Sequence, residues 1–387
     1  MLRKLKYIWH ALILLLVVVG CDVHEFPEER YENVPFKLHL NFTTEMTLYK
    51  EIGYTRGENM DDGSSAAFSH DIRYIVKAFR VLDSRSENRV ADTTFVFTKA
   101  DILDLNYTAQ LYLPEGDYTF RVWADYVEHG TMSDKYYDTR NFEEIILPDP
   151  YNHVASTDFR DAFRGDVTAS VINTLYYTPD AAQGITNEAT VEMSRPMGKY
   201  QFISTDLDAF ITRVIDMMKE REAAQQGSKL SQERPGDMAA GKSMAAFGPV
   251  LGESSELTET QNINIRDFNV VMCYNGYMPC SYNMFTRKPA FAWNGITYKS
   301  KMRLLENNEV ELGFDYIFVN GNETTVSVWV EVYDKDGVLM SKSKPEDVQI
   351  VRSKLTVVRG EFLSSKASGG VSIDPGYEGD DYNIKVD

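Results

Sequence analysis

Residues 113–127 read LPEGDYTFRVWADYV, and this stretch carries the clearest β-strand signal in the chain. Pro114, Glu115 and Gly116 are typical turn residues, and strict alternation of side chains follows them. One face of the predicted strand carries Tyr118, Phe120, Val122, Ala124 and Tyr126. The opposite face carries Thr119, Arg121, Trp123 and Asp125. The pattern predicts a β-hairpin that has one buried face and one wetter face.

The same kind of signal recurs on both sides of this stretch. The sequence FKLHLNF at 36–42 alternates between apolar and polar residues, whereas IRYIVKAFRVL at 72–82 is apolar on both faces, as a central strand would be. Further along the chain, Asn320-Gly321 and Asp336-Gly337 predict tight turns between neighbouring strands. The chain is therefore predicted to be mainly β.

One segment has helical periodicity instead. Residues 205–225 are predicted to form a long helix that ends before Gly227. Its apolar stripe, which we expect to pack on a sheet, consists of Leu207, Phe210, Ile211, Val214, Ile215 and Met218. Residues 226–260 lose all periodicity and fill with Gly, Ser, Gln, Ala and Glu, so they are predicted to form a long flexible loop.

These signals divide the chain into five parts. Residues 1–20 are predicted to be a signal peptide, and residues 21–35, which are acidic and contain two prolines, a tether. A first β domain is expected over 36–190. A second β domain is expected over 191–360, with the long helix and the flexible loop inside it, and a tail follows over 361–387.

The signal peptide ends abruptly at a cysteine. Three basic residues precede a short apolar run over 11–19, which Gly20 and Cys21 close. The run is too short to span a bilayer, because spanning needs about 20 apolar residues. The sequence Val18-Val19-Gly20-Cys21 resembles the bacterial lipobox, whose cysteine receives diacylglycerol and a further acyl chain such as palmitate. We predict lipidation of Cys21; the alternatives are an ordinary signal peptide or a signal anchor.

The charge balance restricts the partners. The chain has 40 Lys and Arg against 58 Asp and Glu, for a net charge of −18. Such a chain repels nucleic acid and anionic lipid headgroups, so no nucleic-acid partner is expected. The link to a membrane is predicted to be the N-terminal lipid rather than a basic patch.

The remaining cysteines are Cys273 and Cys280, seven positions apart. They could close a small disulfide loop in an exported protein, or both could be buried thiols. None of the histidines beyond residue 20, at positions 24, 39, 70, 129 and 153, lies close to them in sequence. No zinc site, and no other metal or cofactor, is therefore predicted.

Motifs for catalysis are absent from the sequence. It contains no GxSxG nucleophile elbow, no GxGxxG or GxxxxGK[ST] phosphate loop and no HExxH. Carboxylate pairs such as Asp101 and Asp104 could act in a glycosidase only if they were buried and facing each other. Strand tryptophans, at positions 123, 293 and 329, could stack on sugars or pack in a core. The protein is predicted not to be an enzyme.

Several stretches, taken in order, resemble a known group of proteins. They are CDVHEFPE after the lipobox, VPFKLHLNF, DIRYIVKAF, residues 113–127, DFRDAFRG, SRPMGKYQFISTDL and YNGYMPCSYNMFTRKP. Their order and spacing are similar to those of the fimbrillin-like lipoproteins of Bacteroidetes, of the Mfa2/FimB type. The resemblance implies two tandem transthyretin-like β-sandwiches, export to the outer membrane and a place in fimbriae that mediate adhesion. It also implies other fimbrial subunits as partners, with a host or bacterial surface ligand as a further candidate.

In that family, an arginine-specific protease removes an N-terminal segment from stalk subunits, and the freed groove accepts a strand from the next subunit. Arg30 is a candidate for this cleavage, but it precedes the first predicted strand, so cutting there would remove only tether. An anchor or accessory subunit is therefore expected. The tail residues Tyr382, Ile384 and Val386 alternate like a strand for exchange, or like one that completes its own sheet. The alternative functions are a surface glycan-binding lipoprotein of a polysaccharide-uptake system and an envelope scaffold.

Overall fold

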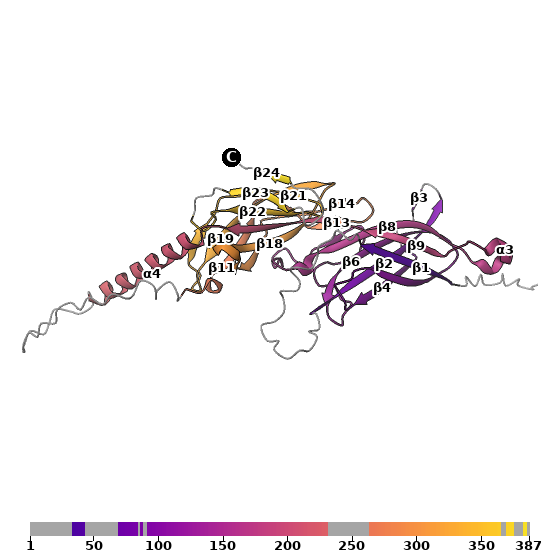
Figure 1. Ribbon diagram of the computed structural model, residues 1–387, viewed down its shortest axis with the longest axis horizontal. Helices are drawn as coiled ribbons and strands as arrows, with labels where there is room; N and C mark the ends of the chain where they lie inside the picture. The colour runs from indigo at the N-terminus through magenta and orange to yellow at the C-terminus, as the bar shows by residue number, and fades with distance from the viewer. Residues whose placement is uncertain are drawn as a thin grey trace, which may run out of the picture.

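The computed structural model of the chain describes residues 33–42, 69–83, 86–87, 91–230, 263–364, 369–374 and 382–384. Of the described residues, 54% are in strands and 11% in helices, so the predicted mainly-β fold class is confirmed. Two β-sandwiches lie end to end along the long axis, and α4 (Leu207–Leu230) extends from one end while α3 (Pro179–Ala182) lies at the other (Figure 1). The chain passes from the first sandwich to the second between Met193, the last residue of β9 (Glu188–Met193), and Met197, the first residue of β10 (Met197–Ser204).

The first sandwich consists of a three-stranded and a five-stranded sheet. The smaller sheet has the order β5-β1-β9, and in the larger sheet β2 lies between β6 on one side and β3 and β4 on the other, with β8 beyond β6. The strands of the smaller sheet are β1 (Val34–Phe42), β5 (Tyr107–Leu113) and β9 (Glu188–Met193). Those of the larger sheet are β2 (His70–Asp83), β3 (Ser86–Glu87), β4 (Thr93–Lys99), β6 (Gly116–Glu128) and β8 (Ala162–Val171).

Alternation in the sequence explains the packing between these two sheets. In β1, Phe36 and every second residue to Phe42 is buried, as FKLHLNF predicted. The Phe36 ring stacks on Phe120 of β6, with 5.0 Å between centroids, so the two sheets meet through aromatic side chains. The interpretation of β2 as a central strand is also confirmed, because it pairs with strands on both sides.

The hairpin predicted at residues 113–127 is wrong. β5 pairs with β1, whereas β6 pairs with β2 and β8, so the turn carries the chain from one sheet to the other. Gly116 has a φ of +152°, which favours glycine at this turn. The Asn320-Gly321 turn likewise joins strands of different sheets, whereas Asp336-Gly337 joins β19 to β20, which do pair. Turn residues specify a reversal of the chain but not the sheet that receives the next strand.

The wetter face predicted for β6 is also wrong. Trp123 and Asp125 are buried completely or nearly so. Arg73 of β2 binds the Asp125 carboxylate through two hydrogen bonds of 2.9 and 2.7 Å, which allows this polar face to be covered. Trp123 packs against Tyr137 and against Phe318 of the second sandwich.

The second sandwich is built from a six-stranded and a five-stranded sheet. The first has the order β17-β18-β10-β22-β23-β24, and the second is β16-β11-β19-β20 with β21 also paired to β19. The six strands are β10 (Met197–Ser204), β17 (Arg303–Leu304), β18 (Val310–Phe318), β22 (Leu355–Gly360), β23 (Gly369–Asp374) and β24 (Tyr382–Ile384). The five strands are β11 (Asn269–Tyr274), β16 (Thr297–Lys301), β19 (Glu323–Tyr333), β20 (Leu339–Lys342) and β21 (Glu346–Val351).

The long helix α4 (Leu207–Leu230) follows β10, which confirms a helix in the second sandwich. It does not stop at Gly227, so residues 226–230 of the predicted loop are helical; a glycine inside a helix costs only about 1 kcal/mol relative to Ala. Residues 231–262 lie outside the described residues. Leu207, Phe210 and Val214 are buried, whereas Met218 is 46% exposed, so only the first part of the predicted stripe packs on the sandwich.

Short elements complete the fold. They are η1 (Asp158–Arg160), η2 (Thr174–Tyr176), α3 (Pro179–Ala182), η4 (Ile265–Asp267), η5 (Glu306–Asn308), and the small sheets β12 (Tyr277–Pro279) with β15 (Ala292–Asn294) and β7 (Ile145–Ile146) with β13 (Ser281–Asn283) and β14 (Lys288–Pro289). The pairing of β7 with β13 links the two halves of the chain. Among the helices that are described, none has the length and apolar character needed to cross a membrane.

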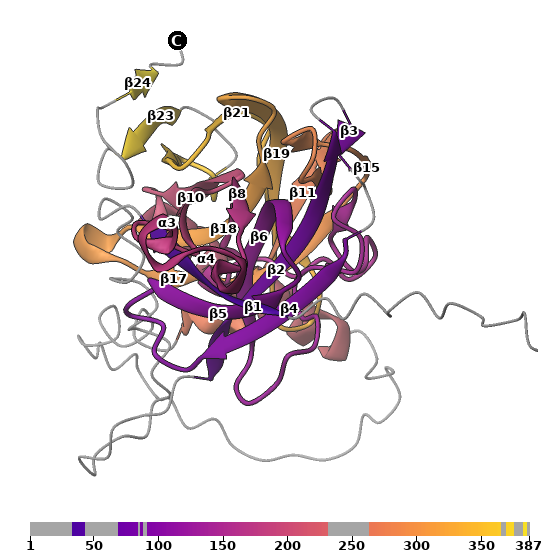
Figure 2. The ribbon, with the colours of Figure 1, turned by 90° about the vertical axis from the view of Figure 1, so that its right-hand side faces the viewer.

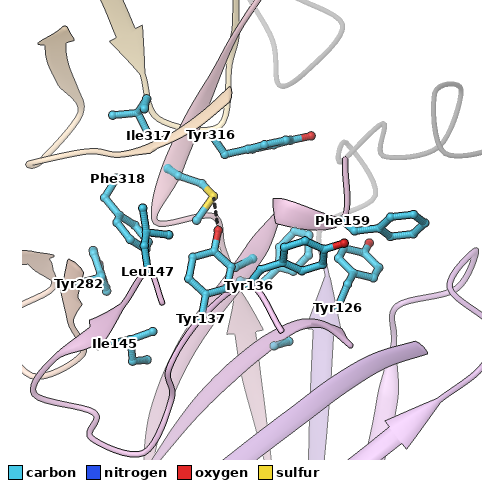
Figure 3. Packing of buried hydrophobic residues seen from close by; sticks show 14 of the residues in the cluster. Tyr126, Tyr136, Tyr137, Ile145, Leu147, Phe159, Tyr282, Tyr316, Ile317 and Phe318 are labelled. Atoms are coloured by element: carbon cyan, nitrogen blue, oxygen red, sulfur yellow. Dashed lines mark hydrogen bonds between the residues drawn. The ribbon is translucent and has the colours of Figure 1, made fainter. Parts of the chain in front are cut away.

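An apolar cluster lies where the two sandwiches meet (Figure 3). Tyr282 and Phe318 of the second half stack with 5.6 Å between their ring centroids. Tyr137 of the first half lies 5.8 Å from the Phe318 ring, and its hydroxyl approaches the sulfur of Met197 at 3.8 Å. All four side chains are buried, so the two sandwiches share one continuous core at this point.

Candidate functional site: open strand edges and a buried joint

One side of the first sandwich ends in two edge strands. Among the described strands, β4 pairs only with β2, and β5 pairs only with β1. They approach each other through Phe97 and Tyr107, whose ring centroids are 5.5 Å apart. The outer backbone groups of both strands therefore have no strand partner within the part of the chain that the structure describes. We call this side the open edge, defined by Thr93–Lys99 and Tyr107–Leu113.

The other side of the same sandwich is closed. Arg164 of β8 and Ser194, which follows β9, exchange two backbone hydrogen bonds of 2.8 and 2.9 Å. Gly165 makes this approach possible, because a Cβ on it would lie only 2.4 Å from the Val191 side chain and 2.8 Å from the Glu192 carbonyl. Within the residues that the structure describes, the sandwich thus has one sealed side and one open edge.

Half-buried aromatic side chains line the open edge. Phe95, Phe97 and Tyr107 are each partly buried against the core, and Tyr107 stacks on the buried Tyr74 with 4.9 Å between centroids. On the outer face of β4, Val96 is 37% exposed. Lys99 closes the end of this edge by donating to the carbonyls of Asp104 and Asn106.

This arrangement can bind an extended peptide. An edge strand offers unpaired backbone donors and acceptors, and pockets beside it can select alternate side chains of an added strand. At the open edge, the backbone of β4 would supply the pairing and the half-buried aromatics the pockets.

The second sandwich places the tail at its own edge. Tyr382 and Ile384 belong to β24, which pairs through three residues with β23 at the end of the six-stranded sheet. Val386 lies outside the described residues. β23 in turn pairs with β22, so Gly369–Asp374 cover the edge of β22 and Tyr382–Ile384 lie beyond them.

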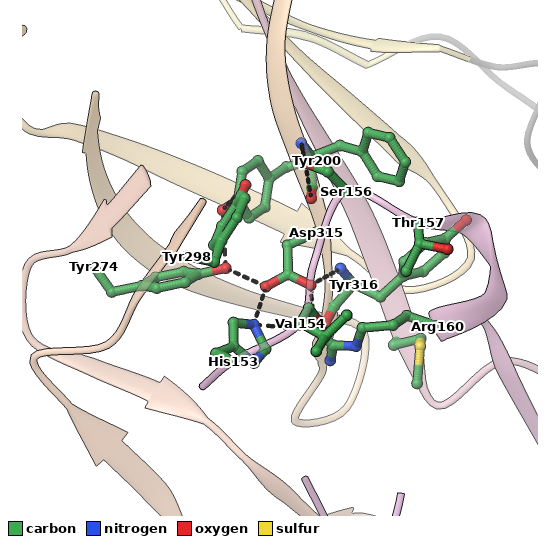
Figure 4. A network of polar contacts seen from close by, with 12 residues as sticks. His153, Val154, Ser156, Thr157, Arg160, Tyr200, Tyr274, Tyr298, Asp315 and Tyr316 are labelled. Atoms are coloured by element: carbon green, nitrogen blue, oxygen red, sulfur yellow. Dashed lines mark hydrogen bonds and ion pairs between the residues drawn. The ribbon is translucent and has the colours of Figure 1, made fainter. Parts of the chain in front are cut away.

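A buried polar network joins the two sandwiches (Figure 4). Its centre is Asp315 of β18, which is completely buried. His153 and Tyr274 contact its Oδ2 at 2.6 and 2.7 Å, and Arg160 donates to its Oδ1. His153 and Arg160 come from the segment between β7 and β8 in the first half of the chain. This joint therefore connects the halves through one carboxylate.

The electrostatics keep the joint charged and paired. Burial opposes the ionised form of Asp315, but the charges of Arg160 and His153 and the hydrogen bonds from His153 and Tyr274 outweigh it and lower the pKa of Asp315. Burial raises the pKa of Tyr274 and of Tyr200 far above their usual range, so both phenols stay protonated and act as donors. The Tyr200 hydroxyl donates to that of Tyr274 at 2.8 Å.

The joint has no room for a substrate. The cavity beside His153 and Arg160 measures about 20 Å³, which holds about one water molecule. A buried carboxylate that is fully used by donors from two sandwiches stabilises their relative position. We therefore assign the joint a structural role.

The surface also carries a larger groove with basic walls. It has a volume of about 710 Å³ and lies between the Ala155–Asp158 segment and strands β16 to β18. Lys299, Lys301, Arg303 and Arg266 line it, together with Asp158 and Glu311. Arg303 is engaged with Glu311, and Lys301 with Asn269. Lys299, which pairs with Val271 of β11 through the strand ladder, is exposed.

The structure describes only some of the predicted site residues. Cys21 and Arg30 lie outside the described residues. Cys273 and Cys280 are both free and buried. The sequence left a disulfide and two buried thiols as alternatives, and the structure contains the two buried thiols. Within the described ranges, no cluster of three or more His, Cys, Asp or Glu could hold a metal ion.

Asp101 and Asp104 are exposed rather than buried, whereas Trp293 and Trp329 are both partly buried. Asp101 and Asp104 accept backbone N–H groups of Leu103 and Asn106 in their own loop, and the Asp104 side chain is 60% exposed. Trp123 is completely buried, so it presents no surface to a sugar.

Sequence reasoning missed the residues of the joint. His153 and Asp315 are 162 positions apart, and neither belongs to a motif. The one local signal was the DFR sequence at 158–160, where Thr157 caps η1 and thereby positions Arg160. No spacing rule connects that signal to Asp315.

The chain matches one family model over residues 32–387, which is described as a family of unknown function, DUF6562. No curated protein matches the chain.

Solved structures with a similar shape include the following proteins. The fimbrial anchor protein Mfa2 from Porphyromonas gingivalis has a TM-score of 0.39 and 9% identity, with 91% of this chain and 99% of that chain covered. A fimbrial assembly protein from Parabacteroides distasonis has a TM-score of 0.35 and 10% identity, with 91% and 99% covered. A candidate polysaccharide-binding protein from Bacteroides thetaiotaomicron has a TM-score of 0.40 and 8% identity, with 90% and 98% covered. Similarity this distant carries no function across, so the function must rest on this chain's own residues.

Proposed function

We propose that this chain, which belongs to the family of unknown function DUF6562, is a lipid-anchored anchor or accessory subunit of a surface fibre. It joins neighbouring fimbrial subunits by strand addition and catalyses no reaction. The observation that carries this proposal is the open edge, where β4 and β5 each have one strand partner among the described strands. Main-chain pairing at such an edge, with alternate side chains in the aromatic pockets, supplies both affinity and register.

The lipid anchor is proposed at Cys21. The apolar run that stops at Gly20-Cys21 supports it, and a stable anchor follows from two or more acyl chains, each buried methylene contributing about 0.8 kcal/mol. The expected location is the outer membrane, with the protein body exposed at the surface. No cofactor or metal is required for this role.

The position of Arg30 favours an anchor or accessory role over a stalk. β1 begins at Val34 and lies at the centre of its sheet, between β5 and β9. Cleavage after Arg30 would leave β1 in place, so it would open no groove in the first sandwich. The proposed protease site would therefore shorten the tether without preparing the chain to polymerise.

The tail is proposed as a strand that can be donated. β24 has β23 as its one partner among the described strands, and only three residue pairs connect them. If β24 left β23 to pair with a longer strand on a neighbouring subunit, the chain would lose only the hydrogen bonds of these three residue pairs. The chain thus has an accepting edge in the first sandwich and a donatable strand in the second.

The joint suits a subunit that carries load. A fibre transmits force through each subunit, and a hinge between two sandwiches would absorb it. The Asp315 network and the aromatic cluster around Phe318 instead fix the sandwiches to each other.

The experiment that tests strand addition places charge on the open edge. Thr94→Lys with Val96→Lys puts two lysines on exposed positions of β4, and lysine on an edge strand blocks pairing in natural sheets. The matched control is Thr168→Lys with Thr190→Lys, which puts the same charges on β8 and β9 at the closed side. Both variants are produced in the native host and purified in detergent.

The open-edge variant should fold with an unchanged melting temperature and lose copurification of other fimbrial subunits, while the control keeps it. Equal copurification by both variants would remove the open edge as the site of assembly. Loss in both would mean that charge on the first sandwich, rather than the edge, is responsible.

A second candidate function is binding of an acidic surface glycan in the groove lined by Lys299, Lys301 and Arg303. The groove favours it because cationic side chains gather there in a chain of net charge −18. Lys299→Glu with Lys301→Glu should abolish retention on an immobilised acidic polysaccharide at low salt. Retention equal to that of the unmodified chain would contradict this candidate and leave the fibre role untouched.

A further inference from the structure

The segment between β8 and β9 presents apolar side chains to solvent. Leu175 is 78% exposed, Tyr176 is 76% exposed and Tyr177 is 44% exposed. Every residue from Leu175 to Ala181 is exposed. Of residues 172–187, only Asp180 is charged, in a chain with a net charge of −18. We call residues 172–187 the tip segment.

The tip segment is a built structure. At its base, the Asn187 side chain donates to the Ile172 carbonyl at 2.8 Å and accepts from the Ile172 N–H at 2.9 Å. Asn173 caps η2 through the Leu175 N–H, and Thr178 caps α3. The capped turns hold Leu175 and Tyr176 outward rather than folded onto the sandwich, although burying such side chains would stabilise the fold.

The tip segment lies at the pole where the N-terminal strand begins. β1 runs parallel to β9, and the Lys37 N–H donates to the Asn187 carbonyl at 2.8 Å, so Val34 starts beside the base of the tip segment. Tyr112, which is 57% exposed, pairs with Pro35 at the same pole. Figure 2 looks onto the molecule from this end, and α3, β1 and β5 lie toward the viewer.

We propose that the tip segment docks on the membrane surface that carries the lipid anchor, with Leu175, Tyr176, Tyr177 and Tyr112 at the headgroup level. This inference rests on the proposed lipidation of Cys21. It goes further by assigning the orientation of the protein: the first sandwich faces the membrane and the second faces away from it.

The short segment between Cys21 and the first strand supports the membrane, rather than a distant protein, as the partner of the tip segment. Residues 22–33 connect Cys21 to Val34, and a tether of this length spans about 45 Å when fully extended and about 20 Å on average as a coil. The pole with the tip segment is therefore held close to the bilayer. α4, at the opposite end of the molecule in Figure 1, is held away from it.

The chemistry of the pole matches the interface of a bilayer. Tyr is enriched at that interface, where its ring packs against the upper part of the acyl chains and its hydroxyl stays hydrated among the headgroups. The exposed acidic residues around the tip segment, Glu115, Asp117 and Glu188, would be repelled by anionic lipid. The proposed surface is therefore zwitterionic.

The test reads the depth of single labels on the lipidated full chain. An environment-sensitive thiol fluorophore is attached at Tyr176→Cys, and the matched control label is attached at Tyr151→Cys. Tyr151 is 97% exposed and lies in the segment next to the joint, away from the pole. Burial raises the pKa of Cys273 to about 11 and that of Cys280 to about 12, so the native thiols resist labelling. The labelled proteins are reconstituted in phosphatidylethanolamine–phosphatidylcholine vesicles that contain nitroxide-bearing lipid.

The emission maximum of the label at position 176 should shift to shorter wavelength, and the nitroxide should quench most of its fluorescence. The emission of the label at position 151 should change little. If the protein floats with the vesicles and both labels stay equally exposed to water, the tip segment does not dock and only the lipid anchor stands. If the protein does not float at all, the anchor and this inference fail together.

A second variant separates a membrane from a protein partner. Leu175→Asp with Tyr177→Asp should leave flotation and copurification of other subunits intact, but should abolish the quenching of the label at Tyr176→Cys. Loss of copurification while the label at 176 of the parent chain remains in water would overturn the inference, because the tip segment would then bind a neighbouring subunit.

Discussion

Removing the charge of Asp315 should strongly destabilise the protein. Asp315→Asn keeps the shape of the side chain but leaves Arg160, which is also buried, without its anionic partner. The carboxylate accepts from His153, Arg160 and Tyr274, and an amide cannot accept from all three. An unsatisfied buried donor costs about 1–3 kcal/mol, and the broken buried ion pair brings the total to about 3–5 kcal/mol.

The matched control is the same substitution at an exposed pair. Asp104 contacts Lys99 at 3.1 Å with its side chain 60% exposed, so Asp104→Asn should cost no more than about 1 kcal/mol. Equilibrium urea unfolding of both variants, followed by tryptophan fluorescence and far-UV circular dichroism, measures the two losses. Because the joint connects the sandwiches, Asp315→Asn should also split the transition into two steps.

Arg160→Met combined with Asp315→Asn completes the cycle. The double variant should lose less free energy of unfolding than the sum of the single variants, because neither buried charge is left alone. If Asp315→Asn costs no more than Asp104→Asn and unfolds in one step, the joint does not hold the sandwiches together.

Three further results are expected. Cys21→Ala should release the protein from membranes or leave it unprocessed, and an acylated variant that still needs detergent for extraction would contradict the anchor. Deletion of 378–387 should leave the melting temperature unchanged and reduce copurification of other subunits; a clear loss of stability would mean that the tail only completes its own sheet. Burial raises the pKa of Asp161 to about 6 despite the opposing charge of Arg195. The folded state therefore binds this proton more tightly than the unfolded state, whose Asp has a pKa of about 3.9. Stability should accordingly rise as the pH falls from about 6 to about 4, and Asp161→Asn should flatten that rise in urea titrations at different pH values.

The parts of the fold that depend on local alternation were predictable from the sequence. The alternation around Phe36 placed β1 with its buried face correctly, and the helical stripe located α4. The hairpin at 113–127 failed because Pro114 and Gly116 encode a reversal but do not encode the sheet that β6 joins.

The candidate site depends on contacts that local patterns do not contain. Asp125 was predicted to be solvent-exposed because its partner Arg73 is 52 positions away in the sequence. His153 and Asp315, which meet in the joint, are 162 positions apart. The open edge is equally invisible in the sequence, because only the sheet order shows that β4 has β2 as its one partner among the described strands. These long-range contacts and this open edge exist only once the strands have been assembled into sheets.

Strand addition at the open edge is the central claim, and cross-linking in intact fibres tests it most directly. A photo-reactive benzophenone amino acid replaces Val96 of β4 in one strain and Thr168 of β8, on the closed side, in another. After illumination of whole cells, the protein with the group at 96 should form one covalent adduct with a fimbrial subunit, mapped by mass spectrometry to a short strand-like segment of that subunit. The protein with the group at 168 should form none. Adducts at 168 but not at 96, or none at either position on cells that carry fibres, would contradict the claim that this chain accepts a strand at its open edge.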